Sequence, residues 1–142
     1  MAVVIERRYC DAIHPLHAVL LAGGVPLYLG VALCDWAYMA SFHIQWSNFA
    51  SWLIVGGLIL TAVTLVFALV DLLRPRRRGR GIAAYFVVLL ATWVVGFFNA
   101  LLHARDAWAV MPGGMILSLV TLLLSIAAVW LAFPTSRMGD PV

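Results

Sequence analysis

Residues 114–132 read GMILSLVTLLLSIAAVWLA, and this stretch decides the fold. Large aliphatic residues fill most of it, while small or hydroxyl-bearing residues recur at steps of three and four: Gly114, Ser118, Thr121, Ser125, Ala128 and Ala132. This spacing keeps the small residues on one face of an α-helix. In a membrane such a face meets other helices, because Leu gains nothing by exchanging lipid for another Leu. The stretch therefore predicts a membrane-spanning helix whose small and polar face is turned inward.

Three other apolar segments carry the same stripe. Its members are His14, His17, Leu21, Gly24, Tyr28, Val31 and Asp35 in the first, Gly57, Thr61, Thr64, Ala68 and Asp71 in the second, and Thr92, Gly96, Asn99, His103 and Asp106 in the third. We expect helices at about 13–35, 48–73, 82–104 and 110–133, each long enough to cross about 30 Å of hydrocarbon. Short connections favour antiparallel neighbours. The fold class is thus all-α: an integral membrane, antiparallel four-helix bundle, up-down-up-down, forming a single transmembrane domain over 1–142 without a soluble domain.

Composition and charge agree with a membrane protein. The chain has 142 residues, of which 65% are hydrophobic and 11% charged, and its mean hydropathy is +1.04. A soluble domain of this size could not bury so much apolar surface. Five of the nine basic residues fall within 74–80, a loop that the positive-inside rule keeps in the cytoplasm. We therefore expect a membrane protein with both termini cytoplasmic, contacts with membrane lipid and no nucleic-acid partner.

Aromatic residues mark the expected membrane interfaces. We expect an aromatic loop at about 36–47 on the outer side, with Trp36, Tyr38 and Trp46, and we place Tyr85 at headgroup level on the inner side.

Ionisable members of the stripe fall into two layers. The inner layer holds His14 and His17 at the start of the first helix and Asp71 at the end of the second. Two histidines and a carboxylate could hold a transition metal such as iron, zinc or copper, or could bind a proton. His-Pro-x-His is also an adequate start for a helix at the membrane interface, and that alternative stays open.

The outer layer holds Asp35, Asn99 and His103, with His43 in the adjoining loop. Haem b with two histidine ligands needs imidazoles on opposite sides of the iron, which leaves His43 with His103 as the candidate pair. A quinone could instead accept hydrogen bonds from Asn99 or His103, with Asp35 in support. A structural hydrogen bond between helices would explain Asn99 equally well.

No pattern for hydrolysis or group transfer stands out, because no Ser or Cys lies beside a His in a usable arrangement and no phosphate-binding Gly loop is present. We expect no catalytic residues. The favoured function is a non-catalytic membrane subunit or anchor of a redox system that holds a quinone or haem near the outer face. Its partner would be a membrane or periplasmic redox protein, or a second copy of the chain. The alternatives are a purely structural module and a metal or proton site at the inner face.

The opening motif resembles a known family. His14-Pro15-Leu16-His17, then Val25-Pro26-Leu27 and Asp35, is similar to the bacterial membrane proteins grouped as domain of unknown function 2231. The resemblance implies a four-helix inner-membrane protein without an assigned activity, and relatives near redox proteins favour a redox-linked role. Many members carry a histidine early in the third helix, where this chain has Ala83, Ala84 and Tyr85. That departure removes a partner for His14 or His17.

Overall fold

Four long helices make up most of the chain that the computed structural model describes, which is residues 14–73, 80–105 and 110–133. They are α2 (Pro15–Ser41), α3 (Ile44–Leu73), α4 (Arg80–His103) and α5 (Gly113–Ala132). All four are long and apolar enough to span a membrane. The arginine-rich segment 74–79 and the stripe member at position 106 lie outside the described residues. Within these limits the all-α prediction is confirmed.

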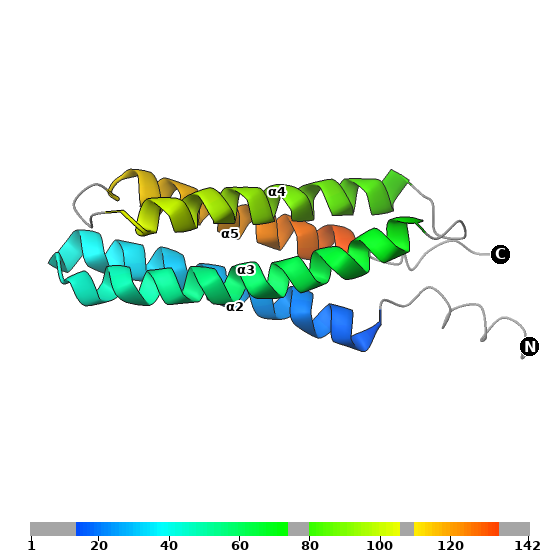
Figure 1. The fold of residues 1–142 in the computed structure, drawn as a ribbon, viewed down its shortest axis with the longest axis horizontal. Helices are drawn as coiled ribbons and strands as arrows, with labels where there is room; N and C mark the ends of the chain where they lie inside the picture. The colour runs from blue at the N-terminus through cyan, green and yellow to red at the C-terminus, as the bar shows by residue number, and fades with distance from the viewer. Residues whose placement is uncertain (1–13, 74–79, 106–109, 134–142) are drawn as a thin grey trace, which may run out of the picture.

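The helices form an antiparallel bundle, with consecutive helices running in opposite directions (Figure 1). Each helix packs against its neighbour in the chain, and α2 also packs against α5, which closes the ring. Helices α2 and α4 therefore face each other across the diagonal of the bundle. The beginning of α2 and the end of α5 lie at the same end, as the up-down-up-down prediction requires.

The predicted stripe forms the bundle interior. Thr61, Asn99 and Ser118 expose 5%, 1% and 1% of their surface, whereas Trp52 and Trp130 expose 71% and 78%. Such an arrangement suits a membrane, where polar side chains find partners between helices and apolar side chains meet lipid. His14 and Asp71 are the described exceptions, the first exposed and the second half-buried, and each lies near a helix end.

The predicted aromatic loop at 36–47 is wrong. Helix α2 continues to Ser41 and α3 begins at Ile44, so the connection is only Phe42 and His43. Phe42 has a φ of 55°, and its N–H bonds the carbonyl of Tyr38 at 2.7 Å, which ends α2 with a left-handed cap. The aromatic and polar residues of 36–47 suggested a loop. This segment contains no Gly or Pro that would interrupt a helix.

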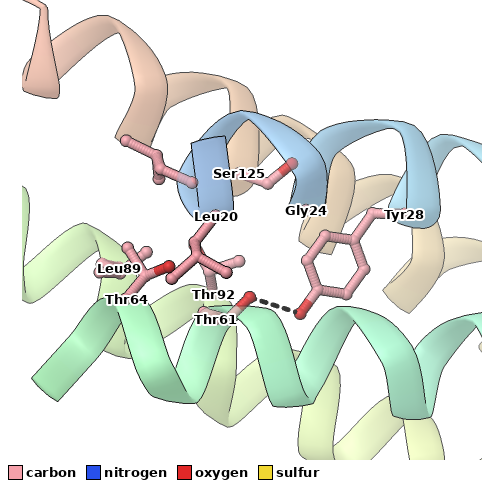
Figure 2. A pocket seen from close by; sticks show the side chains of 9 residues that line it. Leu20, Gly24, Tyr28, Thr61, Thr64, Leu89, Thr92 and Ser125 are labelled. Atoms are coloured by element: carbon pink, nitrogen blue, oxygen red, sulfur yellow. Dashed lines mark hydrogen bonds between the residues drawn. The ribbon is translucent and has the colours of Figure 1, made fainter. Parts of the chain in front are cut away.

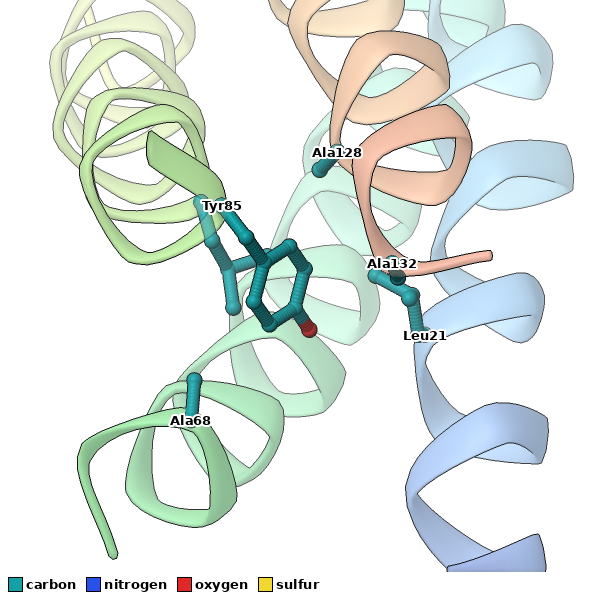
Figure 3. Packing of buried hydrophobic residues seen from close by; sticks show 6 residues of the cluster. Leu21, Ala68, Tyr85, Ala128 and Ala132 are labelled. Carbon is teal, nitrogen blue, oxygen red and sulfur yellow. The ribbon is translucent and has the colours of Figure 1, made fainter. Parts of the chain in front are cut away.

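Small side chains bring the helices together where α2 begins and α5 ends. There Leu21, Ala68, Tyr85, Leu89, Ala128 and Ala132 form what we call the apolar cluster. Figure 3 shows Tyr85 reaching from α4 into the space between the other helices. Towards the opposite end, α2 and α3 pack through a second group, Val31, Cys34, Ala50 and Ile54.

Candidate functional site

A buried carboxylate links three helices near the α2–α3 turn. Asp35 of α2 has no exposed surface. Its Oδ1 lies 2.8 Å from Nε2 of His103 in α4, and its Oδ2 accepts a hydrogen bond of 2.5 Å from Oγ of Ser118 in α5. We call Asp35, Asn99, His103 and Ser118 the Asp35 site. Intramembrane carboxylates are rare because burial of their charge is costly, so this one needs an explanation.

The hydrogen bonds of His103 show how many protons His103 and Asp35 hold together. Nδ1 lies 3.0 Å from the backbone carbonyl oxygen of Asn99, and because a carbonyl can only accept, Nδ1 carries a hydrogen and donates it. One further proton is then shared between Nε2 and the carboxylate of Asp35. Whether that proton is on the imidazole or on the carboxyl, the pair has no net charge, which an apolar interior favours.

Asn99 and Ser118 complete the Asp35 site. Asn99 Nδ2 donates to Ser118 Oγ at 2.9 Å, and Ser118 in turn donates to Asp35. Among the described residues, Oδ1 of Asn99 is buried without a hydrogen-bond partner. The Ser118 hydroxyl faces the carboxylate rather than the imidazole, so His103 does not activate it as a nucleophile.

Of the four residues predicted to hold a cofactor, the structure brings three together: Asp35, Asn99 and His103. His43 is exposed in the α2–α3 turn, and in the described part of the chain no hydrogen bond or ring contact links it to His103. Both ring nitrogens of His103 already have partners, so neither is free to bind an iron.

The three residues of the inner layer have separate roles. His14 is exposed and caps α2, its Nδ1 accepting from the N–H of Leu16 at 3.3 Å. His17 is buried, with Nε2 2.8 Å from the hydroxyl of Tyr85 and its ring stacked on Phe67 at 5.6 Å. Asp71 lies close enough to interact electrostatically with His17. Among the residues that the structure describes, no three His, Cys, Asp or Glu side chains are grouped as a metal would require.

Sequence reasoning missed the roles of two buried side chains that form polar contacts between helices. Tyr85, which we placed at headgroup level, is 7% exposed and lies in the interior, where its hydroxyl supplies the partner of His17. It precedes Thr92 by seven residues, so extension of the stripe by one heptad would have found it. Ser118 was in the stripe, but only its contact with Asp35 marks it as part of a site.

Comparison with known proteins agrees with this architecture. A family model described as "Predicted membrane protein (DUF2231)" matches residues 13–136, which covers all four helices. No curated protein and no solved structure matches the chain. The four apolar helices and the family's description together identify a membrane protein. The chain belongs to the DUF2231 family of predicted membrane proteins.

Proposed function

We propose that this protein is a membrane module that binds and releases a proton inside its bundle, at the Asp35 site. The observation that carries the proposal is the 2.8 Å contact between the fully buried carboxylate of Asp35 and the buried imidazole of His103. Gain or loss of one proton would leave a net charge in the apolar interior. Gain or loss of a proton by this pair therefore requires either a compensating charge nearby or a movement of the helices.

The choice of residue types supports proton exchange over a merely structural role. Neutral groups join helices elsewhere in this bundle, as in the contact of 3.0 Å between the hydroxyls of Tyr28 and Thr61. A carboxylate and an imidazole cost more to bury than two hydroxyls. What they add is the ability to bind and release a proton, whereas hydroxyl groups keep theirs at ordinary pH.

A structural brace is the second candidate. The Asp35 site ties α2 to α4 and α5, and nearly all of its polar atoms have partners. In that role the pair would keep its proton at every pH at which the protein stays folded.

The redox role predicted from the sequence remains a prediction. A haem iron would have to displace a partner of His103, because both ring nitrogens of His103 are in hydrogen bonds. Asn99 gives one N–H to Ser118, and among the described residues its second N–H and its Oδ1 have no hydrogen-bond partner. A proton-binding module could supply protons to a redox partner that takes up protons together with electrons. An absorption spectrum of the purified protein, before and after dithionite, tests for haem, and His103→Ala should abolish any haem band.

The inner-membrane location and the cytoplasmic termini also remain proposals. They are supported by the five arginines of 74–80 in the sequence, since α3 ends with Leu73 at the end of the bundle away from Asp35. With that segment in the cytoplasm, the Asp35 site lies towards the outer face.

Infrared difference spectroscopy tests the proposed function directly. The protein in lipid nanodiscs is titrated with acid and base while the carbonyl stretch of protonated carboxyl groups is recorded. We expect a pH-dependent carboxyl band coupled to a change in a histidine ring mode, because the proton that the pair binds or releases is shared by these two groups. Asp35→Asn should remove both signals, since an amide keeps the shape of the side chain but cannot exchange the proton.

Asp71→Asn is the matched control, because Asp71 is also a carboxylate of the described helices but lies at the other end of the bundle. It should leave the coupled signal intact. A coupled signal that survives in Asp35→Asn, or no exchange over the pH range in which the protein is folded, would establish the structural brace instead.

A further inference from the structure

Ser118 lies between two polar side chains in the Asp35 site. Its Oγ accepts a hydrogen bond of 2.9 Å from Nδ2 of Asn99 and donates one of 2.5 Å to Oδ2 of Asp35. Because a hydroxyl has a single hydrogen, it can donate to only one of these neighbours at a time. The three groups therefore form a hydrogen-bond chain that runs from the amide through the hydroxyl to the carboxylate.

The hydroxyls in the middle of the bundle are bonded in a different way. Figure 2 shows those that line a small central cavity, among them the bonded pair of Tyr28 and Thr61. Thr61 donates to the carbonyl of Gly57, so the hydrogen between Tyr28 and Thr61 belongs to Tyr28. Carbonyls of their own helices also accept from Thr64, Thr92 and Ser125.

Only the chain through Ser118 has partners that allow it to reverse. A backbone carbonyl can only accept, so the bonds around the central cavity run in one direction. A carboxyl group donates when it is protonated and accepts when it is not, and an amide side chain can present either its N–H or its oxygen. The direction of the chain through Ser118 therefore depends on whether Asp35 carries a hydrogen on Oδ2.

The geometry of Asp35 and His103 favours the gain of a proton over its loss. Removal of the shared proton would leave Nε2 of His103 and Oδ1 of Asp35 as two acceptors 2.8 Å apart, because Nδ1 donates its hydrogen to the carbonyl of Asn99. An added proton creates no such conflict. Nε2 then donates to Oδ1, and the added hydrogen is left for Oδ2, which faces Ser118.

A hydrogen on Oδ2 requires the chain to reverse. The hydrogens of Oδ2 and of the Ser118 hydroxyl cannot point at each other, so Ser118 must turn its hydrogen away from Asp35. Its other side-chain neighbour is Asn99, whose Oδ1 is buried without a partner among the described residues. A half-turn of the amide about its Cβ–Cγ bond puts Oδ1 in the place of Nδ2, where it accepts that hydrogen. The amide makes one bond with Ser118 in either orientation.

The turn of the amide also suits the added charge. The second proton gives the Asp35 site one net positive charge, and the carboxyl group that receives it has no exposed surface. The oxygen is the negative end of an amide dipole, and the half-turn brings this oxygen towards Ser118 and the carboxyl group. A dipole that reorients in this way lowers the cost of the buried charge.

We propose that the Asp35 site takes up a second proton at Oδ2 of Asp35, and that Asn99 is the positioning residue that accommodates it by turning its side-chain amide. The proton is drawn from bulk water, and the O–H bond at Oδ2 is the covalent bond that forms. Its hydrogen bonds Ser118, which then donates to Oδ1 of Asn99. Release of the proton restores the direction seen in the structure. This inference rests on the proposed function, because it specifies where the exchanged proton binds.

Other ionisable side chains leave Oδ2 to Ser118. Those at the same end of the bundle, in the described part of the chain, are Cys34, Tyr38, His43 and Arg105. Helix α5 has no ionisable side chain, and the one in α3 is Asp71, at the opposite end. In the part of the chain that the structure describes, the hydrogen bonds of the Asp35 carboxylate come from His103 and Ser118.

Magnetic resonance of a single labelled asparagine tests the inference. The asparagines of the chain are Asn48, which is exposed, and Asn99, so Asn48→Gln leaves Asn99 as the reporter when asparagine is labelled with heavy carbon and nitrogen isotopes in its side chain. The full chain is titrated in lipid nanodiscs, as in the infrared experiment. We expect the Asn99 amide resonances to shift with the same midpoint as the carboxyl band, because the oxygen gains a hydrogen bond and the nitrogen loses one.

Variants of α5 provide matched controls. Ser118→Ala removes the link between the two groups, so the Asn99 resonances should no longer follow the carboxyl band. Ser118→Thr keeps a hydroxyl at this position and should restore the shift. Thr121→Val removes a buried hydroxyl of the same helix that donates to the carbonyl of Leu117, and it should leave the shift unchanged.

The outcomes separate this inference from the proposed function. A carboxyl band that changes with pH while the Asn99 amide keeps its resonances would overturn the inference and leave the proposed function standing. A shift of Asn99 that persists in Asp35→Asn would also overturn it, because the amide would then respond to another group. A carboxyl band that does not change with pH would contradict the proposed function and this inference with it.

Discussion

The two ends of the bundle share one geometry and differ in chemistry. At each end a buried histidine pairs with a residue 68 positions away, and both pairs join α2 to α4 across the bundle diagonal. At one end the imidazole of His17 meets the phenol of Tyr85 in a single hydrogen bond. At the other end the imidazole of His103 meets the carboxylate of Asp35, which also binds α5 through Ser118.

On the proposed function, this difference separates two tasks, joining helices and exchanging protons. A phenol and a neutral imidazole can fasten two helices without a buried charge. The buried carboxylate of Asp35 needs the donors that His103 and Ser118 provide, and in the proposed function it shares the proton that is exchanged. We therefore expect substitutions at the two ends to differ in how much stability they remove and in whether they change the infrared signal of the Asp35 site.

The largest expected effect is from Asp35→Ala. The change leaves His103 and Ser118 without their acceptor, and breaking a buried pair in this way costs about 3 kcal/mol or more. Equilibrium unfolding in mixed micelles measures the loss of stability. Asp71→Ala, at the other end and half-buried, should cost clearly less. Equal losses for the two variants would contradict the special position of Asp35.

A pair of glycine substitutions compares the packing at the Asp35 site with that in the middle of the bundle. At Gly114 an added Cβ would lie 2.5 Å from Cγ1 of Val110 and 3.1 Å from Cε1 of His103. Neither group can move freely. We therefore expect Gly114→Ala to lower the free energy of unfolding by about 1–3 kcal/mol in the same measurement.

Gly24→Ala is its counterpart, because a Cβ there would meet its nearest atom, Oγ1 of Thr61, at 3.9 Å. Since Ala also favours the helix over Gly, this variant should be neutral or slightly stabilising. The opposite order of the two variants would show that the Asp35 site is not the tightly packed region.

Of the two substitutions that remove hydrogen bonds between helices, Tyr85→Phe is expected to have the smaller effect. It removes one hydrogen bond to His17 and keeps the ring in the apolar cluster, so the stability should fall by about 0.6 kcal/mol, the average for a hydrogen bond between membrane helices. Because the Asp35 site is untouched, its infrared signal should not change. A loss as large as that of Asp35→Ala would mean that the two ends support the fold equally.

Much of the fold and part of the site could be predicted from the sequence. The stripe identified the interior face of every helix, and it placed Asp35, Asn99 and His103 at one depth. It could not show that Ser118 completes the site, because a serine in a stripe is equally a close-packing residue. Burial of Tyr85 between the helices was not predicted, because an aromatic residue near a helix end is typical of the membrane interface.

The sequence by itself determined that four apolar helices cross a membrane and which face of each turns inward, because spacing along a helix fixes direction and lipid sorts side chains by polarity. Only the tertiary structure decided which inward groups touch. That choice depends on the relative height and rotation of helices far apart in the chain, which put Asp35 against His103 and left His43 exposed in the turn.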